Sequence, residues 1–174
     1  MASARHHIHP DADLDVVVTN VPALHVMAVD QVATPTTIGE AMQHAFERLF
    51  GGVDAAAVAV VGPPFARYPE MPAGEFRFEL CVPVGLTAGR AHPGPGGTDG
   101  AQRDAELRDI EPVRAATLRY RGAYDDVGPS WTWLLDWVRT HGYAVRGPLR
   151  EVYLDDPDTC GPEGPDTLLV VPIG

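Results

Sequence analysis

Hydrophobic and polar positions follow two different periods along the chain. Residues 16–29 are rich in valine and are interrupted by Pro22, which predicts a strand with a bend. Residues 75–82 alternate between apolar and polar side chains, as expected of a strand with one buried face. Between these strands, apolar residues return at helical spacing, which predicts a helix. The residues of that helical face are Ile38, Met42, Ala45, Phe46 and Leu49.

Local signals predict where this helix begins and ends. Thr37 and Glu40 have the spacing of a capping box, in which a hydroxyl and a carboxylate bind free amides of the first turn. Gly51 and Gly52 predict the end of the helix, because glycine tolerates the left-handed cap conformation. The apolar run 57–61, which stops before a Gly-Pro pair, predicts a short buried strand.

The same order of elements returns in the second half of the chain. Residues 110–121 predict a strand that carries Pro112, and residues 129–141 predict a helix ended by Gly142. Residues 149–154 and 166–173 predict two further strands. Three proline-containing segments of the first half align with segments of the second: 21–23 with 111–113, 62–63 with 147–148, and 82–85 with 171–174. We therefore predict an α+β fold, a tandem β-α-β-β repeat with pseudo-twofold symmetry.

The predicted organisation is a flexible tail, residues 1–15, followed by one ligand-binding domain, residues 16–174. Its halves span residues 16–85 and 110–174, and the Gly-, Pro- and Ala-rich residues 86–109 link them. If both helices lie on one side of the sheet, the opposite face is left to form a central groove where the halves meet.

Charge and motifs exclude several classes of function. The chain has 24 acidic and 13 basic residues, for a net charge of −11, so direct binding to nucleic acid or to an anionic membrane is not expected. Nothing before Val16 is long enough for a helix-turn-helix, and the N-terminus lacks the apolar core of a signal peptide, which favours a cytoplasmic location. Cys81 and Cys160 belong to no CxxC motif, and no nucleotide-binding motif is present, so neither a metal site nor a cofactor is expected.

Three segments of the second half resemble the GyrI-like small-molecule-binding domain. They are residues 120–128 (YRGAYDDVG), 141–143 (HGY) and 147–154 (GPLREVYL), and Ala123 stands where the family often has proline. This domain is the effector domain of many AraC-type and multidrug-sensing transcription regulators, and it also occurs alone, as in DNA gyrase inhibitory proteins. The resemblance covers residues 16–174. It implies two β-α-β-β halves around a groove for apolar, often cationic, aromatic compounds, with Glu151 as the acidic group at its base.

The alternation of a strand is consistent with this role for Glu151. Glu151 and Tyr153 point to one face while Val152 and Leu154 point to the other, so Glu151 faces the groove if the aliphatic pair faces the helices. Glu151 could instead be an exposed carboxylate, or the partner of Arg150 or Arg67. The candidates for the groove walls, each of which could instead be simple packing, are Tyr153, Tyr124, Phe65, Tyr68 and Trp131.

Three functions remain open at this point. The first is a binding protein for lipophilic, cationic or aromatic small molecules, held by Glu151 and by aromatic faces. The second, which the family resemblance implies for some members, is hydrolysis of cyclopropanoid or similar toxins, with Glu151 activating water and Tyr124 or Tyr153 binding the departing oxyanion. The third is a protein interaction, such as gyrase modulation or a homodimer, through Trp133 and Trp137, which otherwise pack locally.

Overall fold

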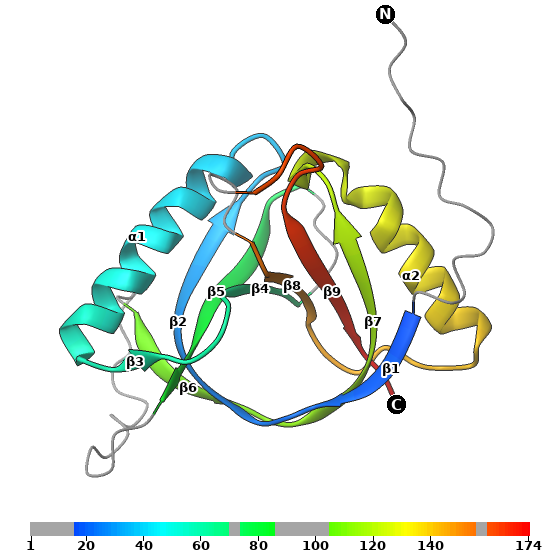
Figure 1. Cartoon of the computed structure of the whole chain (residues 1–174), viewed down its shortest axis with the longest axis horizontal. Helices are drawn as coiled ribbons and strands as arrows, with labels where there is room; N and C mark the ends of the chain where they lie inside the picture. Colours follow the sequence, from blue (N-terminus) through cyan, green and yellow to red (C-terminus); the bar gives the residue numbers. More distant parts are fainter. Residues whose placement is uncertain (1–15, 70–73, 86–104, 156–159) are drawn as a thin grey trace, which may run out of the picture.

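The computed structural model describes residues 16–69, 74–85, 105–155 and 160–174. These residues form one large antiparallel sheet and two α-helices, which confirms the predicted α+β class (Figure 1). The first half of the chain contributes β1 (Val16–Val21), β2 (Leu24–Ala33), α1 (Ile38–Ala56), β3 (Ala59–Val60), β4 (Phe65–Tyr68) and β5 (Phe76–Gly85). The second half contributes β6 (Glu106–Ile110), β7 (Val113–Arg121), the short 3-10 helix η2 (Tyr124–Asp126), α2 (Gly128–Thr140), β8 (Leu149–Tyr153) and β9 (Asp166–Pro172).

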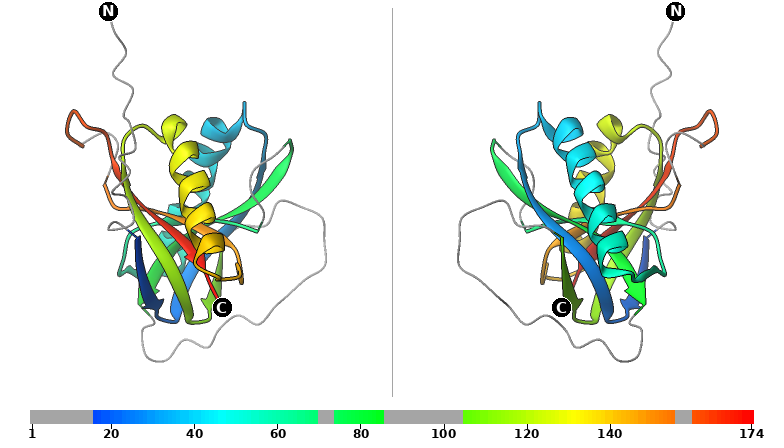
Figure 2. Two further views of the ribbon diagram at one scale, coloured as in Figure 1. Left: turned by 90° about the vertical axis from the view of Figure 1, so that its right-hand side faces the viewer. Right: turned by 90° about the vertical axis from the view of Figure 1, so that its left-hand side faces the viewer.

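The two halves meet at the centre of the sheet. The strand order is β1-β7-β9-β8-β4-β5-β2-β6, and β3 pairs separately with β5. Strands β4 and β8, one from each half, pair with Ala66 opposite Glu151. Helix α1 packs against β2 and β5, and α2 packs against β7 and β9. The two side views in Figure 2 look onto α2 and α1 in turn, each on its own flank of the sheet.

The first strand of each half pairs with a strand of the other half. Pro22 and Pro112 cannot donate to a ladder, and each divides a predicted strand into two. Strand β1 then pairs with β7 of the second half, and β6 pairs with β2 of the first. The bent segments β1–β2 and β6–β7 run together along the lower edge of Figure 1 and join the two ends of the sheet.

The core lies mainly between the sheet and the helices. Helix α1 buries one row of residues spaced by four, and α2 buries three residues at helical spacing. The buried helical residues are Ala41, Ala45, Leu49, Val53, Trp131, Leu134 and Val138. A smaller cluster on the other face of the sheet contains Val26, Ala28, Phe65, Cys81 and Ile110.

Two predictions about α1 are wrong. Thr37 precedes the helix, but its hydroxyl accepts a hydrogen bond from the backbone N–H of Thr34 at 2.9 Å rather than from a helix amide. The helix also continues through Gly51 and Gly52 to Ala56, and the residue that follows it, Ala57, adopts a left-handed conformation with φ 52°. Gly52 permits close packing instead, because a Cβ there would lie 2.3 Å from the Cβ of Ala105.

Other local predictions have mixed outcomes. Helix α2 ends before Gly142, whose φ is +77°, as predicted. The run 57–61 is not a buried strand, because β3 is two residues long and exposed. Strand β6 occupies the end of the predicted linker, while residues 1–15 and 86–104 lie outside the described residues. Within the described part of the chain, neither α-helix is both long and apolar enough to cross a bilayer.

Candidate ligand-binding cavity

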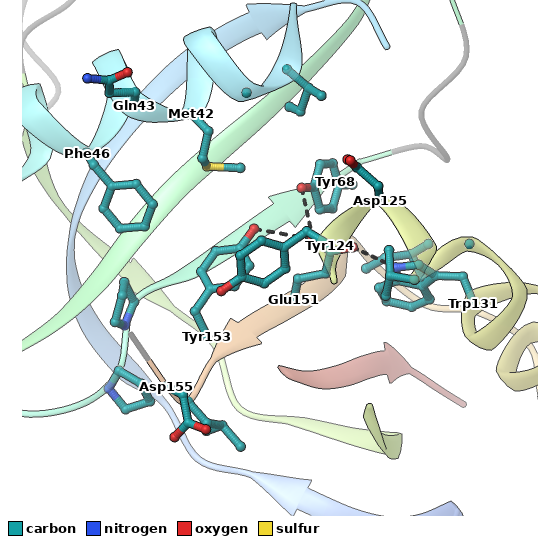
Figure 3. A pocket seen from close by; sticks show the side chains of 18 of the residues that line it. Met42, Gln43, Phe46, Tyr68, Tyr124, Asp125, Trp131, Glu151, Tyr153 and Asp155 are labelled. Carbon is teal, nitrogen blue, oxygen red and sulfur yellow. Dashed lines mark hydrogen bonds between the residues drawn. The ribbon is translucent and has the colours of Figure 1, made fainter. Parts of the chain in front are cut away.

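A cavity of about 1410 Å³ lies between α1 and α2 above the central strands (Figure 3). Its floor is formed by residues of β4 and β8, and its sides by α1 and by the segment that leads from η2 into α2. Because the helices cover the outer strands of each half, they leave β4 and β8 between them. The predicted groove on the face opposite the helices is therefore wrong: Glu151 shares its face with Ala66 and Leu169, which pack in the main core with both helices.

Glu151 is the hydrogen-bond acceptor at the floor of this cavity. The indole Nε1–H of Trp131 donates to its Oε1 at 2.7 Å. The hydroxyls of Tyr68 and Tyr153 both donate to its Oε2, each at 3.2 Å. Figure 3 shows the three donors converging on the carboxylate from β4, β8 and α2. Three aromatic side chains from both halves of the chain thus fix the orientation of one carboxylate.

The electrostatic character of the cavity is negative. Asp125 and Asp155 also line it, and none of the described residues around it is arginine, lysine or histidine. Burial raises the pKa of Tyr68, and the neighbouring Glu151 charge acts in the same direction. Burial also raises the pKa of Tyr153 well above its ordinary value, with Tyr68 and Glu151 as further causes. Both phenols therefore remain protonated donors at neutral pH.

Aromatic rings surround the carboxylate. Tyr124, which is 38% exposed, meets the ring of Tyr153 edge-on with centroids 5.5 Å apart. The ring of Phe46 of α1 is tilted against that of Tyr153, with centroids 6.3 Å apart. Tyr68 packs beside Phe76 with centroids 6.4 Å apart, and Trp131 is almost fully buried. The cavity therefore offers flat apolar surface next to a fixed negative charge.

Phe65 does not belong with these residues. The structure places it on the opposite face of the sheet, 2% exposed, in the smaller cluster with Val26 and Cys81. The reason is the alternation of β4, which turns Ala66 and Tyr68 toward the cavity face and Phe65 and Arg67 away from it. Arg67 forms an ion pair with Glu79, so it is not the partner of Glu151.

The sequence reasoning missed the contribution of α1. Ile38, Met42 and Phe46 line the cavity, followed one turn later by Phe50. This row lies beside the buried row that begins at Ala41, so the helix carries two adjacent rows spaced by four residues. The sequence does contain a signal for this second contact. The apolar stripe formed by both rows is wider than the stripe that packing against the core alone requires. The acidic residues Asp125 and Asp155 were also missed.

Trp133 and Trp137 are partly buried against the main core. The ring of Trp137 stacks on His141 with centroids 3.9 Å apart and lies near Tyr143 at 6.2 Å. Local packing therefore accounts for much of their surface, and a protein partner at this place stays a prediction. Among the described residues, no three potential metal ligands come together.

Solved structures share this fold at low sequence identity. The C-terminal domain of EcmrR is 17% identical with a TM-score of 0.73, over 91% of this chain and 96% of that one. The chain spans only 56% of the EcmrR chain in its DNA complex, at 17% identity, 91% coverage of this chain and a TM-score of 0.72. A hydrolase from Listeria innocua is 14% identical with a TM-score of 0.61, over 92% of each chain. SAV2435 bound to tetraphenylphosphonium is 12% identical with a TM-score of 0.55, over 91% of this chain and 93% of that one.

These likenesses concern the fold, and the search of curated proteins found no match. The model of the GyrI-like small molecule binding domain, in contrast, matches residues 14–173. That range includes both halves of the sheet, both helices and every residue of the cavity. The chain belongs to the GyrI-like small molecule binding domain family.

Proposed function

We propose that the protein binds lipophilic cations in the cavity, with Glu151 as their counter-charge. One observation carries the proposal: Glu151 is held by three neutral donors, and no basic side chain lies among the described residues that line the cavity. A carboxylate in an apolar site is costly unless an opposite charge balances it. A bound cation would supply that charge.

The aromatic walls favour a large, delocalised cation over a small metal ion. Such a cation is weakly hydrated, so it loses little when it leaves water, and its apolar body covers the rings of Tyr124, Tyr153 and Phe46. Each aromatic face in contact adds about 0.5–2 kcal/mol of cation–π attraction. The acidic residues Asp125 and Asp155 add to the attraction for positive charge.

Two probes of the same shape and opposite charge test the proposal. Tetraphenylphosphonium, the compound bound by SAV2435, is positive, and tetraphenylborate is negative. Isothermal titration calorimetry should detect the cation and not the anion. Glu151→Gln should weaken tetraphenylphosphonium binding about tenfold or more, equivalent to about 1.4 kcal/mol. Glu47→Gln makes the same charge change at an exposed position of α1 and should leave the affinity unchanged. Equal binding of both probes, or equal losses in both variants, would refute the proposal.

Hydrolysis of a strained, electrophilic compound is the second candidate. It is favoured by a carboxylate that lies beside phenols in one cavity. Glu151 would take a proton from water as the water oxygen bonds to a cyclopropane carbon. The ring C–C bond at that carbon would break, and its electron pair would move to a conjugated substrate oxygen that accepts a hydrogen bond from Tyr124. Mass spectrometry of a cyclopropane alkylator incubated with the protein tests this. Ring-opened product that disappears with Glu151→Gln supports catalysis, and unchanged alkylator excludes it for that compound.

A further inference from the structure

Two arginines lie side by side on the face of the sheet opposite the cavity. Arg67 of β4 and Arg150 of β8 are direct cross-strand partners, so their side chains leave the sheet on the same face. Like charges that face each other across two strands repel. This pair lies next to the smaller buried cluster, and the guanidinium of Arg150 is 6.0 Å from the ring centroid of Phe65.

Arg150 is a buried cation without an acidic partner in the described part of the chain. It is only 4% exposed, and its Nε has no hydrogen-bond acceptor there. Burial lowers the pKa of Arg150, and the neighbouring Arg67 acts in the same direction. A guanidinium nevertheless stays protonated in proteins, so the positive charge remains and lacks compensation.

The nearby carboxylates bind Arg67 and Arg108, and none of those in the described part of the chain binds Arg150. Glu79 binds Arg67 and also accepts from Nη1 of Arg108 at 2.6 Å. Arg108 binds Asp30 and Glu106 as well. The Nε of Arg67 is buried without an acceptor, like that of Arg150. Two buried N–H donors of neighbouring guanidiniums thus remain unused on this face.

We propose that a small inorganic anion of the size of chloride or bromide binds between Arg67 and Arg150. An anion there would satisfy the unused donors and reduce the repulsion between the two guanidiniums. The low exposure of Arg150 and the apolar cluster around it favour a small ion over a nucleotide or an acidic peptide. The site lies on the other face of the sheet from the cavity, so it is independent of the proposed function.

Thermal unfolding in sodium chloride and in sodium gluconate at equal ionic strength tests this site, because gluconate is too large for it. Wild type should show a saturable rise in Tm with chloride. The rise should be kept in Arg77→Met, an exposed arginine on the same face of β5, and lost in Arg150→Met. A chloride response of equal size in all three proteins would be a general salt effect and would overturn the proposal.

A second measurement does not depend on the stability of the variant. Crystals of the wild-type protein soaked in bromide should show an anomalous scattering peak between the two guanidiniums, and Arg67→Met should remove that peak. Arg67→Met leaves Glu79 with Arg108 as a partner, which makes it the milder of the two substitutions. A bromide-soaked wild-type crystal with no peak at this pair would exclude the site.

Discussion

Individual side chains in the cavity combine two properties. Tyr68, Tyr153 and Trp131 each place an apolar ring against the cavity or the core, and each donates one hydrogen bond to Glu151. Aromatic residues with a polar tip suit such a place, because the ring can be buried while the N–H or O–H finds an acceptor. The same three residues therefore shape the cavity and hold the Glu151 carboxylate in place.

A second carboxylate, Asp166, is expected to contribute to the response to acid. Asp166 is 2% exposed and accepts hydrogen bonds from Arg121 and Arg119, which hold its pKa far below its ordinary value. The unfolded chain binds a proton there near pH 4 while the folded chain does not. The contribution of Asp166 to stability is therefore complete above about pH 4 and is lost as the pH falls further.

We therefore expect Tm to fall below about pH 4, and to fall less steeply in Asp166→Asn. Thermal unfolding followed by circular dichroism between neutral pH and pH 3 measures this. Asp136→Asn is the control, because Asp136 pairs with Arg139 on the exposed side of α2, where an ion pair contributes little. Identical slopes for wild type and Asp166→Asn would show that other groups dominate acid unfolding.

Helix α1 contains two neighbouring glycines in different surroundings. A Cβ at Gly51 would meet nothing within 4 Å, whereas one at Gly52 would lie 2.3 Å from the Cβ of Ala105. Gly51→Ala should raise the free energy of unfolding by about 0.5–1 kcal/mol, because alanine loses less entropy in a helix. Gly52→Ala should lower it by about 1–3 kcal/mol through overpacking. Urea unfolding of both variants tests this, and equal effects would contradict the packing of α1 against Ala105.

Elements whose evidence is local were the predictable ones. The alternation of residues 75–82 predicted β5, and Gly142 predicted the end of α2, because each signal acts over a few residues. Gly51 and Gly52 wrongly predicted the end of α1, because glycine can serve close packing as well as helix termination. The placement of Phe65 failed for a related reason: alternation says that Phe65 and Tyr68 lie on opposite faces, but it does not say which face holds the cavity.

At the scale of the whole molecule, the repeat was visible in the sequence and the exchange of strands was not. The prolines at 22 and 112 predicted bends, but the partner of each bent strand depends on contacts far apart in the chain. The same holds for the cavity floor, where Tyr68 of the first half binds Glu151 of the second. The family resemblance pointed to Glu151, but the hydrogen bonds that its three partners donate could be identified only from the structure.

The exchanged strands predict that neither half folds alone. A fragment of residues 16–85 loses β7 as the partner of β1 and β8 as the partner of β4, and a fragment of residues 105–174 loses the complementary strands. We expect the NMR spectrum of each separate fragment to show the narrow amide proton dispersion of an unfolded chain. An equimolar mixture of the two fragments should show the wide dispersion of a folded protein. A dispersed spectrum from either fragment alone would contradict this interdependence.

The hydrogen bond from Trp131 to Glu151 links the intrinsic tryptophan fluorescence of the protein to the state of its cavity. A guest that draws the carboxylate away changes the surroundings of an indole N–H, and indole emission responds to such changes. Titration with tetraphenylphosphonium should therefore shift the tryptophan emission of the unlabelled protein. The shift should disappear in Trp131→Phe and persist in Trp133→Phe. A shift that survives Trp131→Phe would assign the signal to another indole. Ligand binding could then be followed by fluorescence without a dye.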